Sequence, residues 1–206
     1  MDGQRDLDFE TLVRRRRVLL ALALATLAAG CDRPAGTSEI EAIDAGENNT
    51  PAFALRDHNG TPRRLSDFRG RVVAVFFGFT HCPEVCPTTL AEFARVDRML
   101  GPDAERLQVL FVTVDPERDT PQVLSRYVPS FDPRFLGLSG SDEEIRKAAD
   151  AFEVTYRKIP GRTPGDYTLD HTAYVFLLDP SGRLRLKVPY GQSPDALLKL
   201  VRELQD

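Results

Sequence analysis

The chain has 206 residues, of which 42% are hydrophobic and 28% charged, and its formal net charge at pH 7 is −4. This length suits one well-buried domain with a tail and is too short for two domains. The acidic balance argues against a DNA- or RNA-binding protein, because phosphate recognition favours a basic surface. We therefore expect a single globular domain and no nucleic-acid partner.

The segment 1–31 has the layout of a secretory signal. Four arginines at positions 14–17 precede an uncharged stretch at 18–29, and a small residue then leads to Cys31. The apolar core has about a dozen residues, short of the roughly 20 that a membrane-spanning helix needs. The residues just before this cysteine resemble a bacterial lipoprotein processing site, which implies a lipid on Cys31. Asp32 resembles the signal that keeps such lipoproteins in the inner membrane, so we expect a periplasmic protein anchored there.

Two alternatives stay open for this amino-terminal region. Cleavage elsewhere would leave Cys31 as a spare thiol, and the arginine run also fits a twin-arginine signal, so the export route is open. Residues 32–49 are polar and short of large apolar side chains, which is typical of a flexible tether. We expect the folded domain to occupy residues 50–206.

Strand and helix patterns alternate in the first half of this domain. Residues 51–55 alternate like a short strand, and residues 72–79 form a continuous β-branched and aromatic run, as in a strand buried on both faces. Apolar residues at helical spacing predict a helix over 87–100. A second buried strand at 107–114 and a helix at 122–128 complete a βαβα pattern, which predicts a largely parallel sheet.

The second half predicts a helix, an insertion and a hairpin. Ser141 is a candidate N-cap with a glutamate three residues on, as in a capping box. The segment 153–169 carries two Pro-Gly pairs and is expected to be a mobile insertion loop. Strands at 172–178 and 184–188 form a hairpin, and 193–204 form an amphipathic helix. The order fits a thioredoxin-like α/β fold with a mixed, mostly parallel central sheet flanked by helices.

Cys82 and Cys86 lie where the first buried strand meets its helix, in the sequence HCPEVCP. A helix amino terminus stabilises thiolates, which are the reactive and metal-binding form of cysteine. The spacing puts the sulfurs about one helical turn apart, near enough for one metal ion and, after a small adjustment, for a disulfide. A structural disulfide, thiol redox catalysis and metal binding therefore all remain open, with metal binding favoured.

His171 is the natural third ligand for a metal held by these cysteines. It begins the predicted hairpin, and a thioredoxin-like layout brings that segment beside the cysteine turn. A lone histidine is more often a surface or core residue, so its position is decisive. Two thiolates and one imidazole suit Cu(I), whereas structural zinc needs a fourth ligand. We expect one copper ion on Cys82, Cys86 and His171, with His81 pointing elsewhere.

Asp115 and Asp119 flank a proline turn after the second buried strand, at the edge where ligand sites of open α/β sheets collect. Their carboxylates suit two roles equally well. One is to cap the turn and the following helix, and the other is to dock a partner protein.

Three motifs, in order, closely resemble the Sco/SenC family of copper-binding assembly proteins for cytochrome c oxidase. They are residues 76–87 (FFGFTHCPEVCP), 114–120 (VDPERDT) and 166–172 (DYTLDHT). The resemblance runs from about Pro51 to the carboxyl end. Glu84 stands where many relatives have Asp, and neither residue would be expected to bind the metal.

The resemblance implies a metal site, a cargo and a partner. Cys82, Cys86 and His171 would bind one Cu(I) or Cu(II) ion and pass it to the two-copper centre of cytochrome c oxidase subunit II. Another periplasmic protein would supply the copper. The implied role is a copper chaperone rather than an enzyme. The alternative is a thiol-disulfide oxidoreductase that keeps the subunit II cysteines reduced and does not need His171.

The resemblance also implies roles for three acidic residues. Asp115 and Asp119 belong to the family's D-x3-D element, which suggests a contact with the partner. Asp170 would orient the imidazole of His171, as carboxylates often do for metal-binding histidines.

Overall fold

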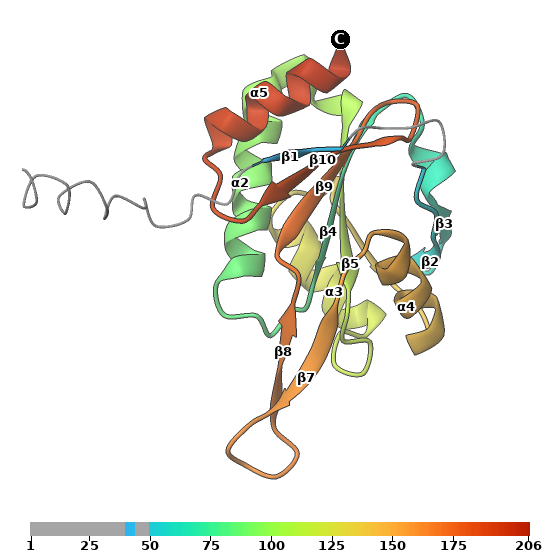
Figure 1. Ribbon diagram of the computed structural model, residues 1–206, viewed down its shortest axis with the longest axis vertical. Helices are drawn as coiled ribbons and strands as arrows, with labels where there is room; N and C mark the ends of the chain where they lie inside the picture. The colour runs from blue at the N-terminus through green and yellow to red at the C-terminus, as the bar shows by residue number, and fades with distance from the viewer. Residues whose placement is uncertain (1–39, 44–49) are drawn as a thin grey trace, which may run out of the picture. The chain divides into compact units, whose positions relative to one another are not determined.

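The computed structural model of the protein describes residues 40–43 and 50–206 (Figure 1). The predicted signal, Cys31 and most of the predicted tether lie outside the described residues. Within the tether, Glu41–Ala42 forms the short strand β1, which pairs with Leu186 and Lys187 of β10 (Leu184–Pro189) and is itself an edge strand of the sheet. Part of this segment therefore joins the sheet, a pairing that its polar composition did not indicate.

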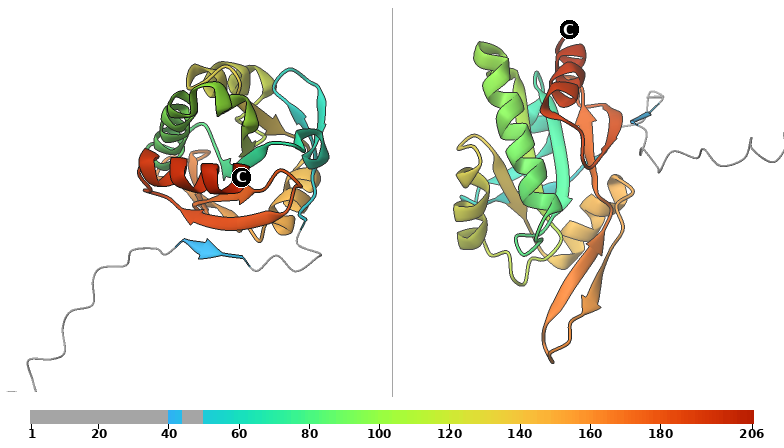
Figure 2. Two further views of the ribbon diagram at one scale, coloured as in Figure 1. Left: turned by 90° about the horizontal axis from the view of Figure 1, so that it is seen from above. Right: turned by 90° about the vertical axis from the view of Figure 1, so that its left-hand side faces the viewer.

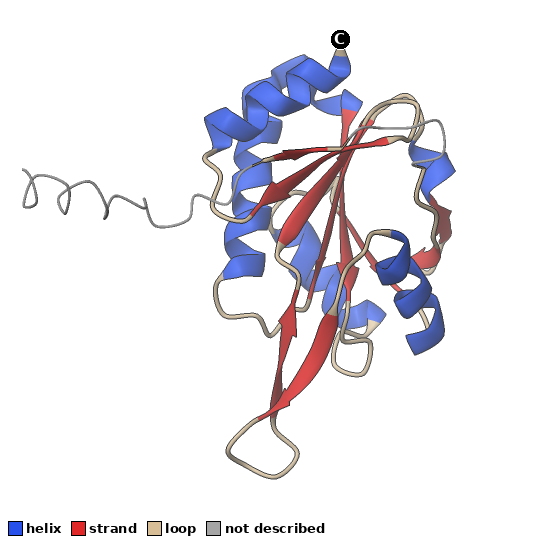
Figure 3. Ribbon diagram, viewed as in Figure 1, coloured by secondary structure: helices blue, strands red, loops and turns tan. Residues whose placement is uncertain are grey.

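An eight-stranded mixed sheet organises the domain (Figures 1 and 3). The other seven strands are β2 (Ala54–Asp57), β3 (Pro62–Arg64), β4 (Val72–Gly78), β5 (Leu107–Thr113), β6 (Leu136–Ser139), β9 (Tyr174–Leu178) and β10 (Leu184–Pro189). Their spatial order is β1-β10-β9-β4-β5-β6-β2-β3. The central strands β4, β5 and β6 are parallel, and the flanking pairs are antiparallel.

Helices cover both faces of this sheet (Figure 2). They are α2 (Val85–Leu100), α3 (Pro121–Tyr127), α4 (Asp142–Ala151) and α5 (Pro194–Gln205), with short 3-10 turns at Leu65–Phe68, Gly101–Arg106 and Val128–Ser130. Helices α2, α3 and α5 pack on one face and α4 on the other. The predicted capping box of α4 is confirmed, since Ser141 Oγ accepts from Glu144 N and Glu144 Oε2 accepts from Ser141 N. Among the described residues, no helix is long and apolar enough to cross a membrane.

Strand β4 is buried on both faces, as its apolar run predicted. Val73, Val75 and Phe77 point into the core beneath α4, while the alternating side chains 72, 74 and 76 point into the core beneath α2. This double burial is what the period-two geometry of a central strand requires. It fixes the position of the segment that follows β4, which carries the two cysteines.

The segment 153–169, predicted to be a mobile loop, instead supplies most of a second, two-stranded sheet. Strands β7 (Tyr156–Pro160) and β8 (Tyr167–His171) pair antiparallel and project beyond the main sheet (Figures 1 and 2). The first Pro-Gly pair begins the turn at the tip of this hairpin, and the second lies within the turn. The alternation of Tyr167, Leu169 and His171 along β8 was the signal for this strand.

Replacing Gly78 by alanine is expected to lower the free energy of unfolding by about 1–3 kcal/mol, because the core cannot absorb the methyl group. A Cβ at this position would lie 2.7 Å from Cys86 Sγ and 2.9 Å from Phe111 Cε2, both fully buried. Urea denaturation measures the change. The control is Gly161→Ala, whose methyl meets the exposed side chain of Asp166 and should change stability by less than about 0.5 kcal/mol. Equal costs would contradict this packing argument.

Candidate metal centre

The cysteines lie at the carboxyl edge of the central parallel strands, where open α/β sheets place ligand sites. Gly78 ends β4, and a short loop leads through Cys82 to the first turn of α2, which contains Cys86. The Cys82 backbone N–H donates to the carbonyl of Phe79 at 3.2 Å, which makes the loop a tight turn. Cys82 is half-buried and Cys86 fully buried. The inner sulfur is therefore held in the core, and the outer sulfur faces the edge of the domain.

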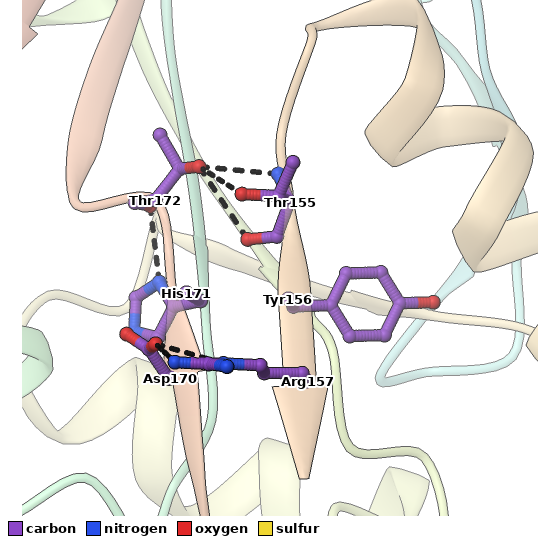
Figure 4. A pocket seen from close by; sticks show the side chains of 6 residues that line it. All are labelled: Thr155, Tyr156, Arg157, Asp170, His171 and Thr172. Atoms are coloured by element: carbon purple, nitrogen blue, oxygen red, sulfur yellow. Dashed lines mark hydrogen bonds and ion pairs between the residues drawn. The ribbon is translucent and has the colours of Figure 1, made fainter.

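His171 ends β8 and lies against two rings of the cysteine-bearing segment. Its ring centre is 5.8 Å from that of Phe79 and 6.3 Å from that of Phe76, both in edge-on arrangements. Its Nδ1 is 3.0 Å from the carbonyl oxygen of Thr172 (Figure 4). Because a carbonyl only accepts, Nδ1 carries the proton, and the lone pair of Nε2 is available to a metal.

The structure brings the three predicted ligands together. One ligand atom from each of Cys82, Cys86 and His171 lies within 4.8 Å of the other two. His81 lies outside this group, is exposed, and has its Nδ1 3.2 Å from Thr80 Oγ1. The set is two sulfurs and one imidazole nitrogen, which favours a soft ion such as Cu(I).

The pKa values of the two thiols are shifted in opposite directions. The hydrogen bond from Cys86 lowers the pKa of the Cys82 thiol well below its usual value, against the opposing effect of burial. The pKa of the Cys86 thiol is raised, first by its hydrogen bond to Cys82 and then by burial. At neutral pH, the pair therefore holds one thiolate and one thiol. Metal binding by both sulfurs would release the proton of Cys86.

Asp119 fixes the loop that carries the cysteines. Its Oδ2 accepts from the backbone N–H of Thr80 at 3.0 Å and from Thr113 Oγ1 at 2.6 Å, while its Oδ1 accepts from Thr80 Oγ1 at 2.5 Å. The side chain is fully buried. This carboxylate therefore ties the start of the cysteine loop to the end of β5.

Asp115 fixes the hairpin that carries His171. Its Oδ1 accepts from the Tyr167 hydroxyl at 2.7 Å, and its Oδ2 accepts from Arg118 Nε. Its backbone carbonyl accepts from the N–H of Asp119 at 2.9 Å, which closes the loop between the two acids. Asp115 and Asp119 are 1% and 0% exposed, which favours the internal role expected for these carboxylates, and a contact with a partner stays a prediction. Both are engaged by internal donors.

Asp170 does not orient His171 as expected. Successive side chains of a strand point to opposite faces, so Asp170 faces away from the ring that follows it. Its carboxylate accepts from Arg157 Nη2 at 2.9 Å and Nε at 3.1 Å. The carbonyl of Thr172 takes the orienting role. Figure 4 shows both interactions. The residues around them line a cavity of about 250 Å³; they are Thr155, Tyr156, Arg157, Asp170, His171 and Thr172.

Three residues of the site were not anticipated from the sequence: Thr80, Tyr167 and Thr172. Thr80 and Tyr167 lie inside the motifs that pointed to the site, but their type alone does not reveal a role. Tyr167 would have emerged from the period-two pattern of β8, which places it on the face of His171. The carbonyl of Thr172 has no signal in the sequence, because every residue carries one.

Comparisons with known proteins identify the family of this chain. The SCO1/SenC family model matches residues 41–206. The mitochondrial "Protein SCO2 homolog" of Mus musculus is 41% identical over 152 residues, which cover 73% of this chain and 60% of the relative. The human protein of that name is 43% identical over 132 residues, covering 63% of this chain and 50% of the relative. The chain thus spans about half to three-fifths of these mitochondrial relatives.

Solved structures show the same fold. ScoI of Bradyrhizobium japonicum, solved with copper bound, is 39% identical with a TM-score of 0.70, covering 75% of this chain and 98% of that one. The apo Sco1 protein of Thermus thermophilus is 49% identical with a TM-score of 0.65, covering 76% and 90%. The predicted thioredoxin-like fold is confirmed. The matched family model and the shared fold establish that this chain belongs to the SCO1/SenC family.

Proposed function

We propose that this protein is a copper chaperone that binds one copper ion through Cys82, Cys86 and His171 and delivers it to the two-copper centre of cytochrome c oxidase subunit II. The observation that carries the proposal is the group of two sulfurs and one imidazole nitrogen within 4.8 Å. The copper bound in ScoI of Bradyrhizobium japonicum supports it. Copper is cargo here, so the protein acts by ligand exchange and needs no turnover chemistry.

The burial of the ligands suits binding followed by release. Cys86 is fully buried, whereas Cys82 and His171 are half-buried at the edge of the domain. A thiolate or imidazole of a partner can therefore approach the ion from the side of the two outer ligands. Each new bond to the partner would replace a bond to this protein, so the ion is never without ligands.

A membrane anchor would keep the domain near its target. The proposed lipid on Cys31, followed by a tether within 32–49, would place the folded domain in the bacterial periplasm beside the inner membrane. The proposed partner in the oxidase would then meet this domain at the same membrane surface. This raises the effective concentration of one for the other.

A second candidate function is reduction of a disulfide in the oxidase subunit. The observation that favours it is the asymmetry of the thiol pair, a half-exposed thiolate beside a buried thiol. Cys82 would attack one sulfur of the substrate disulfide, and the other sulfur would leave as a thiolate. Cys86 would then attack the mixed disulfide, so the substrate gains two electrons and this pair becomes a disulfide.

One copper per chain is expected for the reduced protein, with two sulfur ligands and at least one nitrogen ligand seen by X-ray absorption. His171→Ala should weaken copper binding by about tenfold or more, because the site keeps its two sulfurs but loses its nitrogen ligand. His81→Ala is the matched control, since this exposed neighbour lies outside the ligand group, and its copper affinity should equal that of the unmodified protein. No tight copper, together with disulfide reduction unaffected by His171→Ala, would favour the second function.

Copper is expected to move from the loaded protein to the isolated copper-binding domain of subunit II when the two are mixed in reducing buffer. Copper analysis after separation of the proteins measures the transfer. The control is a loaded donor mixed with the same acceptor domain whose copper-binding cysteines are replaced by serine. Copper that stays on the donor in both mixtures would contradict delivery to subunit II.

Alkylation of Cys82 by iodoacetamide is expected to keep its rate between pH 8 and pH 6. The pKa of this thiol is lowered, so the thiolate that reacts is present across this range. In guanidine, the alkylation rate of the same cysteine should fall by about tenfold for each unit by which the pH is lowered, as for an ordinary thiol of pKa about 8.5. Cys86→Ala removes the largest cause of the shift and should restore part of that pH dependence. An ordinary slope in the folded, unmodified protein would refute the assignment.

A further inference from the structure

The hairpin that carries His171 needs an external support. Strands β7 and β8 form their own two-stranded sheet and are not hydrogen-bonded as strands to the main sheet. An isolated two-stranded hairpin is marginally stable in water. A ligand at the end of such a hairpin would vary in its distance from Cys82 and Cys86 unless other contacts hold the strand.

We propose that Tyr167 and Arg118 are positioning residues that latch β8 onto the loop Asp115–Asp119 and thereby hold His171 within reach of the copper-binding cysteines. This inference rests on the proposed copper site. It concerns the support of one ligand and adds no ligand of its own.

Tyr167 lies on the same face of β8 as the proposed ligand His171. Side chains of a strand alternate between faces, so Tyr167, Leu169 and His171 point the same way. Leu169 is 7% exposed and packs in the hydrophobic core beneath α4. The Tyr167 hydroxyl donates to the buried Asp115 carboxylate at 2.7 Å. One end of this short face is therefore bonded to the core, and the ligand occupies the other end.

Arg118 holds Tyr167 in three ways. Its guanidinium carbon lies 3.8 Å from the centre of the Tyr167 ring, its Nη1 donates to the Tyr167 carbonyl at 2.9 Å, and its Nε donates to the Asp115 carboxylate that Tyr167 also contacts. The same guanidinium lies 5.9 Å from the centre of the Phe79 ring, which packs edge-on against His171. Arg118 thus contacts both Tyr167 and the Phe79 ring, and Phe79 packs against His171.

The exposed ion pair of Lys158 and Glu117 contributes little to holding Tyr167 in place. Lys158 Nζ lies 4.6 Å from the Tyr167 ring centre and 2.7 Å from Glu117 Oε2. Both side chains are about half exposed or more, and ion pairs of this kind contribute little to stability. The buried hydrogen bond to Asp115 and the stacked Arg118 are therefore the contacts that carry the latch.

One loop supports the two halves of the site separately. Asp119 holds the cysteine side through Thr80, and Asp115 holds the histidine side through Tyr167. Loss of the Tyr167 hydroxyl should consequently lower copper affinity only when His171 is present. Loss of the Thr80 hydroxyl should lower copper affinity through the cysteines, whether or not His171 is present.

The test compares Tyr167→Phe in the unmodified and His171→Ala backgrounds, with copper affinity measured by competition against a chelator. In the unmodified background, affinity should fall by about tenfold, the equivalent of one hydrogen bond to a charged group. In the His171→Ala background the same change should have no effect, which a double-mutant cycle reports as full coupling. Thr80→Ala should weaken copper binding in both backgrounds.

Tyr156→Phe is the matched control. Tyr156 is paired with His171 across the same hairpin, but its ring points away from the imidazole in Figure 4. Its hydroxyl makes no hydrogen bond among the described residues, so its loss should leave copper affinity unchanged. Equal affinities for Tyr167→Phe and Tyr156→Phe would overturn the latch, and so would an equal loss with and without His171.

Amide hydrogen exchange of the copper-free protein separates this inference from the proposed function. Exchange in the segment 156–171 should be faster in Tyr167→Phe than in Tyr156→Phe, because the strand loses its bond to Asp115. If the unmodified protein bound no copper, the chaperone proposal would fail and the exchange comparison would still test the latch. Identical exchange in the two variants would overturn it.

Discussion

Two buried carboxylates in one tight loop hold the metal centre together. Asp119 accepts three hydrogen bonds from Thr80 and Thr113, and Asp115 accepts from Arg118 and Tyr167. Unpaired buried carboxylates are costly, so these donors are needed for the loop to fold as it does. Because the donors come from the cysteine segment and from the histidine hairpin, satisfying the two acids also brings the ligands together.

The chemistry of the site follows from which ligand is buried. A fully buried Cys86 holds one sulfur in the core and raises the acidity of its half-buried neighbour through a hydrogen bond. Cys82 and His171 remain open to a partner. A site of this kind can hold a soft ion and also release it, whereas a closed four-ligand site, as in structural zinc centres, resists exchange. The same asymmetry also suits disulfide exchange, which is why the two candidate functions share residues.

Much of this architecture was predictable from the sequence, and the failures have physical causes. The apolar runs of β4 and β5 and the capping box at Ser141 are local signals that tertiary packing reinforced. The motifs also contain the three candidate ligands that the structure brings together. Residues 153–169 were predicted to be a loop because their two Pro-Gly pairs are typical of turns. The short alternation of apolar and polar residues that indicates β8 is a weaker signal. The roles of Asp115, Asp119 and Asp170 depended on side-chain burial and direction, which residue type and spacing do not specify.

A crystal structure of the copper-loaded domain would test most directly whether the ligands are already in place before copper arrives. The account predicts one copper bound by both cysteine sulfurs and by Nε2 of His171, with the Cα atoms of the three ligands moved by less than about 1 Å, as in preorganised complexes. A copper ion bound without His171, or a β7–β8 hairpin displaced by more than about 2 Å, would contradict it.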